Sequence, residues 1–183
     1  MDIKARDCRL LESYSKFKSK VDSLMVRPLR DNQMWDAFYM HSMKKCANFS
    51  VPGSGKTSVV LGVYAYLLEI GEADKIIVVG PKNSFGSWRD EFIDCFGNNI
   101  PLKCFDSHDC SLSRKDEKKR LLNYEYERFN LFLFNYEGVE SYKAAIKKIL
   151  DTGKCILVFD EVHRVKSIDA VSYTHLTLPT IRL

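Results

Sequence analysis

Residues 50–57 read Ser50-Val51-Pro52-Gly53-Ser54-Gly55-Lys56-Thr57, between an apolar run and a stretch of helical periodicity. Glycines at this spacing let backbone N–H groups turn inward around an anion, and the N-terminus of the following helix adds a favourable dipole. The stretch therefore predicts a phosphate-binding loop between a strand and a helix. It departs from the pattern G-x-x-x-x-G-K-[ST] at one position, because Ser50 stands where the first glycine is usual.

Two side chains of this loop have expected chemical tasks. Lys56 would reach the β- and γ-phosphates of a nucleoside triphosphate, and the Thr57 hydroxyl would ligate Mg²⁺. We therefore expect a continuous nucleotide-binding segment made of Pro52, Gly53, Ser54, Gly55, Lys56, Thr57 and Ser58.

Residues 156–163 form the second informative segment, an apolar run that ends in acids, Ile156-Leu157-Val158-Phe159-Asp160-Glu161-Val162-His163. Asp160 would hold Mg²⁺, largely through water, while Glu161 would polarise the water that attacks the γ-phosphate. An isolated pair of acids at a strand end is more often a solvated turn, but a phosphate loop upstream reverses that preference. We therefore predict that Lys56, Asp160 and Glu161 are catalytic, and that neighbouring strands of one sheet bring them together around a magnesium-bound triphosphate.

Helical and apolar segments alternate along the rest of the chain. Periodicity predicts helices over 10–25, 31–43, 55–70, 84–96 and 141–150, and apolar runs predict strands over 46–51, 75–79, 102–105, 131–134 and 155–159. Strands without polar alternation, separated by helices, are typical of a parallel sheet covered on both faces. The predicted fold is therefore an α/β three-layer sandwich with a mostly parallel sheet. Residues 111–128 carry charges of both signs, which indicates a solvated helix face.

Composition sets limits on the class of protein. With 183 residues, 45% of them hydrophobic, the chain can bury one ordinary core, and its formal net charge of +4 is compatible with a polyanionic partner without requiring one. Six cysteines without C-x-x-C spacing indicate a reducing cytosol and no disulfide framework. No run approaches the roughly 20 apolar residues of a membrane span, and the charged N-terminus shows no secretory signal. We therefore expect a cytoplasmic protein.

Residues 104–110 offer the nearest approach to a second metal cluster. Cys104, His108 and Cys110 could each bind a metal, but zinc needs a fourth ligand, and no residue has an obvious place as that ligand. The favoured interpretation is a plain loop.

Residues 160–167, Asp160-Glu161-Val162-His163-Arg164-Val165-Lys166-Ser167, resemble motif II of the Swi/Snf-type helicase-like ATPases of superfamily 2, with Val162 in place of the usual alanine. Three further segments follow the family's order. Residues 29–33 resemble its Q-type motif, residues 79–84 with Trp88 and Glu91-Phe92 resemble motif Ia, and residues 134–137 resemble the segment near motif Ib. The resemblance runs from residue 27 to residue 170.

This resemblance implies the first RecA-like P-loop NTPase domain of a DNA-dependent ATPase, with ATP and Mg²⁺ as cofactors. In such proteins ATP lies between two RecA-like domains, and closure of the cleft is coupled to stepping along duplex DNA. The resemblance implies that Gln33 reads the adenine edge and that Lys82 contacts a DNA phosphate. His163 would bind the nucleotide and, with Arg164, relay its state to a second RecA-like domain beyond Ala170. On this basis the chain alone would bind Mg·ATP weakly and hydrolyse it very slowly, and we expect a bacterial or phage origin.

Three segments are predicted along the chain. Residues 1–26 form an N-terminal helical extension, and residues 27–170 form the RecA-like domain. Residues 171–180 resemble the in-frame translation of a sequencing adapter, so we expect 171–183 to lie outside a truncated domain. A genuine strand or tail is the alternative.

The same motifs are compatible with different assignments. The chain could come from a restriction-modification or repair helicase of the same superfamily, or it could be an ATP-binding scaffold that does not hydrolyse. Gln33 could be an exposed helix residue, Trp88 and Phe92 could be helix core, and Asn135-Tyr136 could be a simple turn after a strand.

Overall fold

The computed structural model describes residues 3–43, 45–47, 53–109, 115–161 and 180–182. These residues form one six-stranded sheet with the strand order β1-β6-β5-β2-β4-β3, in which every neighbouring pair is parallel. The strands are β1 (Lys45–Ala47), β2 (Lys75–Gly80), β3 (Cys104–Asp106), β4 (Leu131–Asn135), β5 (Cys155–Phe159) and β6 (Thr180–Arg182).

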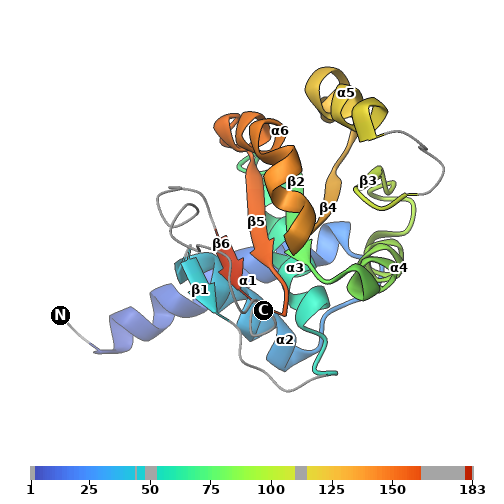
Figure 1. Ribbon diagram of the computed structural model, residues 1–183. Coiled ribbons are helices and arrows are strands. Elements are labelled where there is room, and N and C mark those ends of the chain that lie inside the picture. Colours follow the sequence, from blue (N-terminus) through green and yellow to red (C-terminus); the bar gives the residue numbers. More distant parts are fainter. Residues whose placement is uncertain (1–2, 44, 48–52, 110–114, 162–179, 183) are drawn as a thin grey trace.

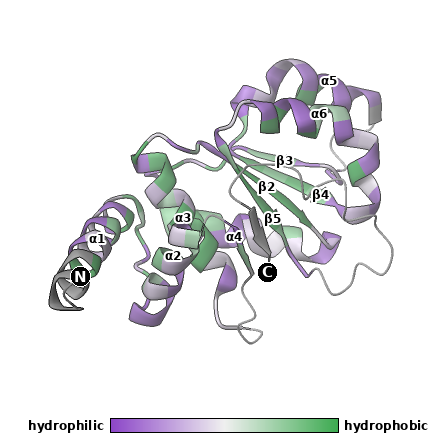
Figure 2. Ribbon diagram, turned by 90° about the vertical axis from the view of Figure 1, so that its left-hand side faces the viewer, coloured by the Kyte–Doolittle hydropathy of each residue, from purple (hydrophilic) through white to green (hydrophobic). Residues whose placement is uncertain are grey.

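The described residues form six α-helices, which lie on both sides of the sheet (Figure 1). They are α1 (Ile3–Leu24), α2 (Asp31–Met43), α3 (Lys56–Glu69), α4 (Phe85–Phe96), α5 (Lys115–Glu125) and α6 (Val139–Asp151). Figure 2 shows α5 and α6 together over one face of the sheet, while α1, α2 and α3 lie on the other. The three-layer α/β sandwich predicted from the sequence is therefore confirmed.

Alternate residues of the central strands supply two separate cores. In β2, Ile76 and Val78 pack with the helices α1 to α4, whereas Ile77 and Val79 pack with α5 and α6. The strands β4 and β5 alternate in the same way. This double burial explains why these strands are continuous apolar runs, since side chains on both faces leave water.

The N-terminal helix belongs to the first of these cores. Phe17 of α1 is 1% exposed and Val21 is fully buried. The boundary predicted after residue 26 therefore does not separate two cores, because α1 shares its buried surface with α2 and α3.

Two strands differ from the sequence-based expectation. The strand predicted over residues 46–51 is observed as β1, and residues 48–52 lie outside the described part of the chain. Within the segment 171–183, which we expected outside the fold, Thr180–Arg182 form β6 between β1 and β5. The physical reason is that β1 and β5 leave a gap one strand wide, and an extended segment there pairs the backbone groups of both neighbours.

The described residues show neither a membrane-spanning helix nor a metal cluster. No helix among them has the length and apolar character that crossing a membrane requires. They also contain no group of three or more His, Cys, Asp or Glu side chains placed to hold a metal ion; Cys104 lies in β3, and Cys110 lies outside the described part.

Candidate nucleotide-binding site

Four of the five sequence motifs meet at one edge of the sheet because the strands that precede them are parallel. The carboxyl ends of β1, β2, β4 and β5 lie at the same edge, and they lead into the phosphate loop, motif Ia, the segment near motif Ib and the two acids, respectively. In open α/β sheets, ligands bind at this edge.

Glycines shape the described part of the phosphate loop. Gly53 and Gly55 have φ values of 80° and 81°, in the left-handed region that side chains rarely adopt. Gly55 is also the residue that caps α3, and a Cβ atom added to it would lie 2.3 Å from Nε2 of Gln33. Gly55 therefore satisfies two requirements, a left-handed turn and the close approach of Gln33.

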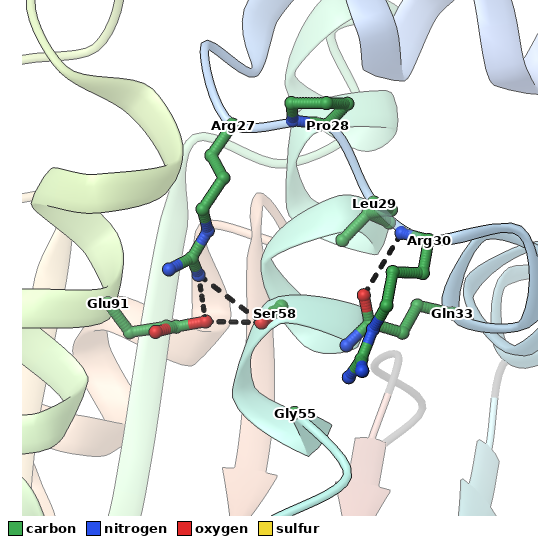
Figure 3. A pocket seen from close by; sticks show the side chains of 8 residues that line it. All are labelled: Arg27, Pro28, Leu29, Arg30, Gln33, Gly55, Ser58 and Glu91. Carbon is green, nitrogen blue, oxygen red and sulfur yellow. Dashed lines mark hydrogen bonds and ion pairs between the residues drawn. The ribbon is translucent and has the colours of Figure 1, made fainter.

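Gln33 and Arg30 bind the phosphate loop through hydrogen bonds to its backbone. Gln33 Nε2 donates to the Ser54 carbonyl oxygen at 3.0 Å, and Arg30 Nη2 donates to the same oxygen at 3.1 Å. Gln33 Oε1 in turn accepts from the Arg30 backbone N–H at 3.1 Å (Figure 3). With only 6% of its surface exposed, Gln33 is a buried residue of α2 and not an exposed helix residue.

A cavity of about 360 Å³ opens beside these contacts (Figure 3). This volume lies within the roughly 300–1,000 Å³ usual for small-molecule sites. Because a primary amide has two N–H groups and two acceptor lone pairs, Gln33 keeps one of each for a ligand. The cavity is lined by Arg27, Pro28, Leu29, Arg30, Gln33, Gly55, Ser58 and Glu91.

Ser58, Glu91 and Arg27 form a polar cluster on the wall of the cavity. The buried Ser58 hydroxyl donates to Glu91 Oε1 in a short hydrogen bond, and the Arg27 guanidinium binds the same carboxylate oxygen. Arg27 Nη2 also lies 3.4 Å from Ser58 Oγ. We did not predict this cluster from the sequence. One feature could have indicated it: Glu91, an acid three residues after Trp88, lies on a helix with a largely apolar face.

Asp160 is held firmly through its backbone. Its N–H donates to the Val79 carbonyl oxygen at 2.9 Å, and its own carbonyl oxygen accepts from the Tyr136 hydroxyl at 2.6 Å. Gly80 makes room for it, because a Cβ atom on Gly80 would lie 3.0 Å from Asp160 Cβ. Burial, together with the charges of Asp160 and Glu161, raises the pKa of Tyr136, so its hydroxyl remains a donor in mild alkali as well as at neutral pH.

Helix α4 joins the acids to the phosphate loop. The indole N–H of Trp88 donates to Oδ2 of Asp160 at 3.1 Å, and one turn later Glu91 binds Ser58 at the start of α3. Trp88 is 1% exposed and Phe92 is fully buried, so both do belong to the helix core, and Trp88 also contacts the site.

Glu161 has a φ of 56°, a left-handed conformation that costs a non-glycine residue about 1–3 kcal/mol and recurs at functional sites.

The structure places most of the predicted site residues at this edge. Lys56 and Thr57 are the first two residues of α3, and both are half-buried; Asp160 and Glu161 follow β5 directly. The prediction that the two motifs follow neighbouring strands is wrong, because β6 lies between β1 and β5. Pro52 and His163 lie outside the described residues.

A second polar group occupies the same edge, after β4. Asn135 is buried, its amide donates to Glu137 in a short hydrogen bond, and its Oδ1 lies 2.7 Å from His108 Nε2. The pKa of Glu137 is lowered by its own backbone N–H, by the Asn135 amide and, further, by the charge of Lys82. A simple turn at Asn135-Tyr136 was the alternative interpretation; the chain forms a 3₁₀ helix there, Tyr136–Gly138, which also carries the Tyr136 contact with Asp160.

The phosphate loop also has an unused hydrogen-bond donor, the Ser54 hydroxyl, that a phosphate group could accept from. Among the described residues, Ser54 Oγ is buried and makes no hydrogen bond, although buried hydroxyl groups usually have a partner. A left-handed glycine turn and an unpaired buried hydroxyl at a helix N-terminus, at the carboxyl edge of an all-parallel sheet, are typical of P-loop NTPase domains, the class to which RecA-like domains belong.

Comparison with known proteins assigns the family. Residues 32–178 match the family described as type III restriction enzyme, res subunit, and the chain belongs to this family. Over 115 residues the chain is 24% identical to the ATP-dependent helicase FUN30 of Saccharomyces cerevisiae, a match that covers 63% of the chain and 10% of FUN30. The predicted resemblance to the Swi/Snf-type helicase-like ATPases is thereby confirmed.

Solved structures agree with the fold. The SWI2/SNF2 ATPase core of Sulfolobus solfataricus in complex with dsDNA superposes with a TM-score of 0.58 at 16% identity, covering 87% of this chain and 32% of that one. The ATPase core domain from the same organism gives 0.57 at 16% identity, with coverage of 87% and 31%. The chain thus spans about a tenth of the curated relative and about a third of each solved chain.

Proposed function

We propose that the chain is the ATP-binding domain of a DNA-dependent ATPase that couples hydrolysis to movement along duplex DNA. The observation that carries the proposal is the bridge made by α4, whose Trp88 contacts Asp160 and whose Glu91 contacts Ser58. A helix that touches both the acids and the phosphate loop supports one shared site for the two motifs.

The residues of this site have separate proposed roles. The loop backbone, Ser54 and Lys56 bind the phosphates, while Thr57 and Asp160 hold Mg²⁺. A bound Mg²⁺ would supply charge neutralisation at the phosphate oxygens. Glu161 orients the attacking water and accepts its proton. Gln33 binds the adenine edge with the amide N–H and lone pair that Ser54 and Arg30 leave unused, and His163 contacts the nucleotide from beyond the described residues.

The proposed partner is duplex DNA, bound at the same edge of the sheet. Lys82 follows β2 at this edge and would bind a backbone phosphate, a contact that salt weakens. One solved relative is described as a complex with dsDNA, which supports this choice. A second RecA-like domain would complete the cleft, and an arginine from it would raise turnover by about 10³ to 10⁵. On this proposal the chain alone binds Mg·ATP weakly and hydrolyses it very slowly.

The family description favours a second candidate, the motor subunit of a restriction enzyme. Both candidates share the ATP site and differ in what the remainder of the protein does to DNA. Parallel ATPase and DNA-cleavage assays on a protein that also holds the second RecA-like domain distinguish them: DNA cleavage would identify a restriction enzyme, and duplex-dependent turnover without cleavage would identify a translocase.

The first test is direct binding of ATP with Mg²⁺ to the 183-residue chain, measured by calorimetry. We expect Lys56→Ala to weaken binding by about 10- to 100-fold, because it removes charge-assisted hydrogen bonds to the phosphates. The matched control is Lys154→Ala, the same charge change on an exposed residue just before β5, at the amino edge of the sheet. Equal effects of the two substitutions, or no binding to the unsubstituted chain, would contradict the proposal.

A further inference from the structure

We propose that Trp88 is a positioning residue for the magnesium-binding carboxylate of Asp160, an inference that rests on the proposed function. The contact is the hydrogen bond from the indole N–H to Oδ2 of Asp160, 3.1 Å long. An indole N–H can only donate, and a buried one usually has a partner. Here that partner is a carboxylate expected to bind a metal ion.

The backbone contacts of Asp160 do not orient its carboxylate, so that orientation depends on contacts of the side chain. Val79, Tyr136 and Gly80 fix where the main chain of Asp160 runs. A carboxylate still rotates about its two side-chain bonds, and a donor at one oxygen selects one orientation. In metal sites such outer hydrogen bonds are typically worth 10- to 100-fold in metal affinity or activity.

The donor itself is rigidly held. Trp88 is 1% exposed, and Phe85 and Phe92 of the same helix are buried in the same core. One turn further on, Glu91 binds Ser58 at the start of α3. Helix α4 therefore fixes the orientation of the Asp160 carboxylate relative to the helix that follows the phosphate loop.

The test separates positioning from core packing by comparing two affinities of the full 183-residue chain. Calorimetry measures the affinity for ATP with Mg²⁺ and for ATP in EDTA. In Trp88→Phe, we expect the affinity for ATP in EDTA to change less than about twofold. We expect the ratio of the affinity with Mg²⁺ to the affinity in EDTA to fall about tenfold. If this ratio is below about ten in the unsubstituted chain, we expect it to fall to one. A residue that only fills space would change stability and leave this ratio intact.

Two controls make the result specific. Phe92→Leu removes a buried ring one turn along α4 that has no hydrogen-bond donor to offer Asp160, and it should leave the ratio unchanged. In the background of Asp160→Asn, Trp88→Phe should have no further effect on the ratio, because the group it positions is gone. A ratio that falls equally in Phe92→Leu, or that falls again in the double variant, would overturn the inference.

A spectroscopic readout covers the case in which Trp88→Phe does not fold. The chain has two tryptophans, so Trp35→Phe leaves Trp88 as the only one, and its emission is excited selectively at wavelengths that tyrosine does not absorb. We expect its fluorescence to change when Mg²⁺ is added to the ATP complex, and Asp160→Asn to abolish the change. If calorimetry shows Mg²⁺-dependent ATP binding but the fluorescence of Trp88 does not respond to Mg²⁺, the proposed role of Trp88 is wrong. If the unsubstituted chain binds ATP equally with and without Mg²⁺, the proposed magnesium site is wrong as well.

Discussion

At the scale of single residues, Gly55 shows how one position joins two motifs. Its φ of 81° requires the left-handed region, and its missing Cβ leaves the space in which Gln33 Nε2 reaches the Ser54 carbonyl. The phosphate loop and the Q-type motif are therefore coupled through the absence of a side chain. The phosphate-loop pattern explains why a glycine is needed for the turn, but it does not indicate that the same glycine also leaves space for Gln33.

A substitution at Gly55 tests this coupling. We expect Gly55→Ala to lower the free energy of unfolding by about 2–4 kcal/mol, because left-handed strain of about 1–2 kcal/mol is joined by loss of the buried Gln33 contact. ATP binding should also weaken. The matched control is Gly71→Ala, with a φ of 75° and no atom within 4 Å of the added Cβ. Urea unfolding of the two variants gives the comparison, and equal losses would show that Gln33 contributes nothing.

The residues that could be predicted are those whose chemistry is local. Lys56 and Asp160 lie in segments whose spacing alone indicates a task, whereas the task of Gln33 is implied by the resemblance to the Swi/Snf-type ATPases. The role of Trp88 could not be predicted, since its partner Asp160 lies 72 residues away along the chain. The same holds for Arg27 and Glu91, whose ion pair spans 64 residues. Only the folded sheet brings such groups together.

At the scale of elements, apolar burial decided which strands were predictable. The predicted limits of β2, β4 and β5 agree with the structure within one residue, because these strands are buried on both faces. Strand β6 was only the alternative interpretation, since residues 171–180 resemble the translation of a sequencing adapter and Thr180-Ile181-Arg182 shows no apolar run. Its place depends instead on the backbone groups of β1 and β5, which the composition of the segment does not indicate.

The contribution of β6 can be measured through its central residue. Ile181 pairs with Cys46 on one side and Val158 on the other. Ile181→Pro removes a backbone donor from the middle of the sheet, so we expect unfolding to require about 1–3 kcal/mol less free energy. Ile181→Val retains the N–H group and serves as control. If both variants unfold at the same urea concentration, β6 does not contribute to the stability of the sheet.

At the scale of the whole molecule, the two cores on opposite faces of the sheet bury thiol groups as well as apolar side chains. Burial raises the pKa of Cys95 to about 11 and that of Cys155 to about 12, from an ordinary value of 9.0. Cys95 belongs to the core beneath α4, and Cys155 to the core beneath α6. Both sides of the molecule therefore disfavour the thiolate form.

These shifts predict that the protein loses stability in mild alkali. The unfolded chain releases its thiol protons near pH 9, while the folded chain keeps those of Cys95 and Cys155 to about pH 11, so the stabilisation is complete below pH 9 and falls as the pH rises. Between pH 8 and pH 10 the two thiols together should cost about 3 kcal/mol of unfolding free energy. Urea unfolding at both pH values measures this loss. Cys155→Ala should reduce the loss between pH 8 and pH 10 by about 1 kcal/mol whatever it does to stability at pH 8, and an unchanged slope would mean that this thiol titrates normally in the folded protein.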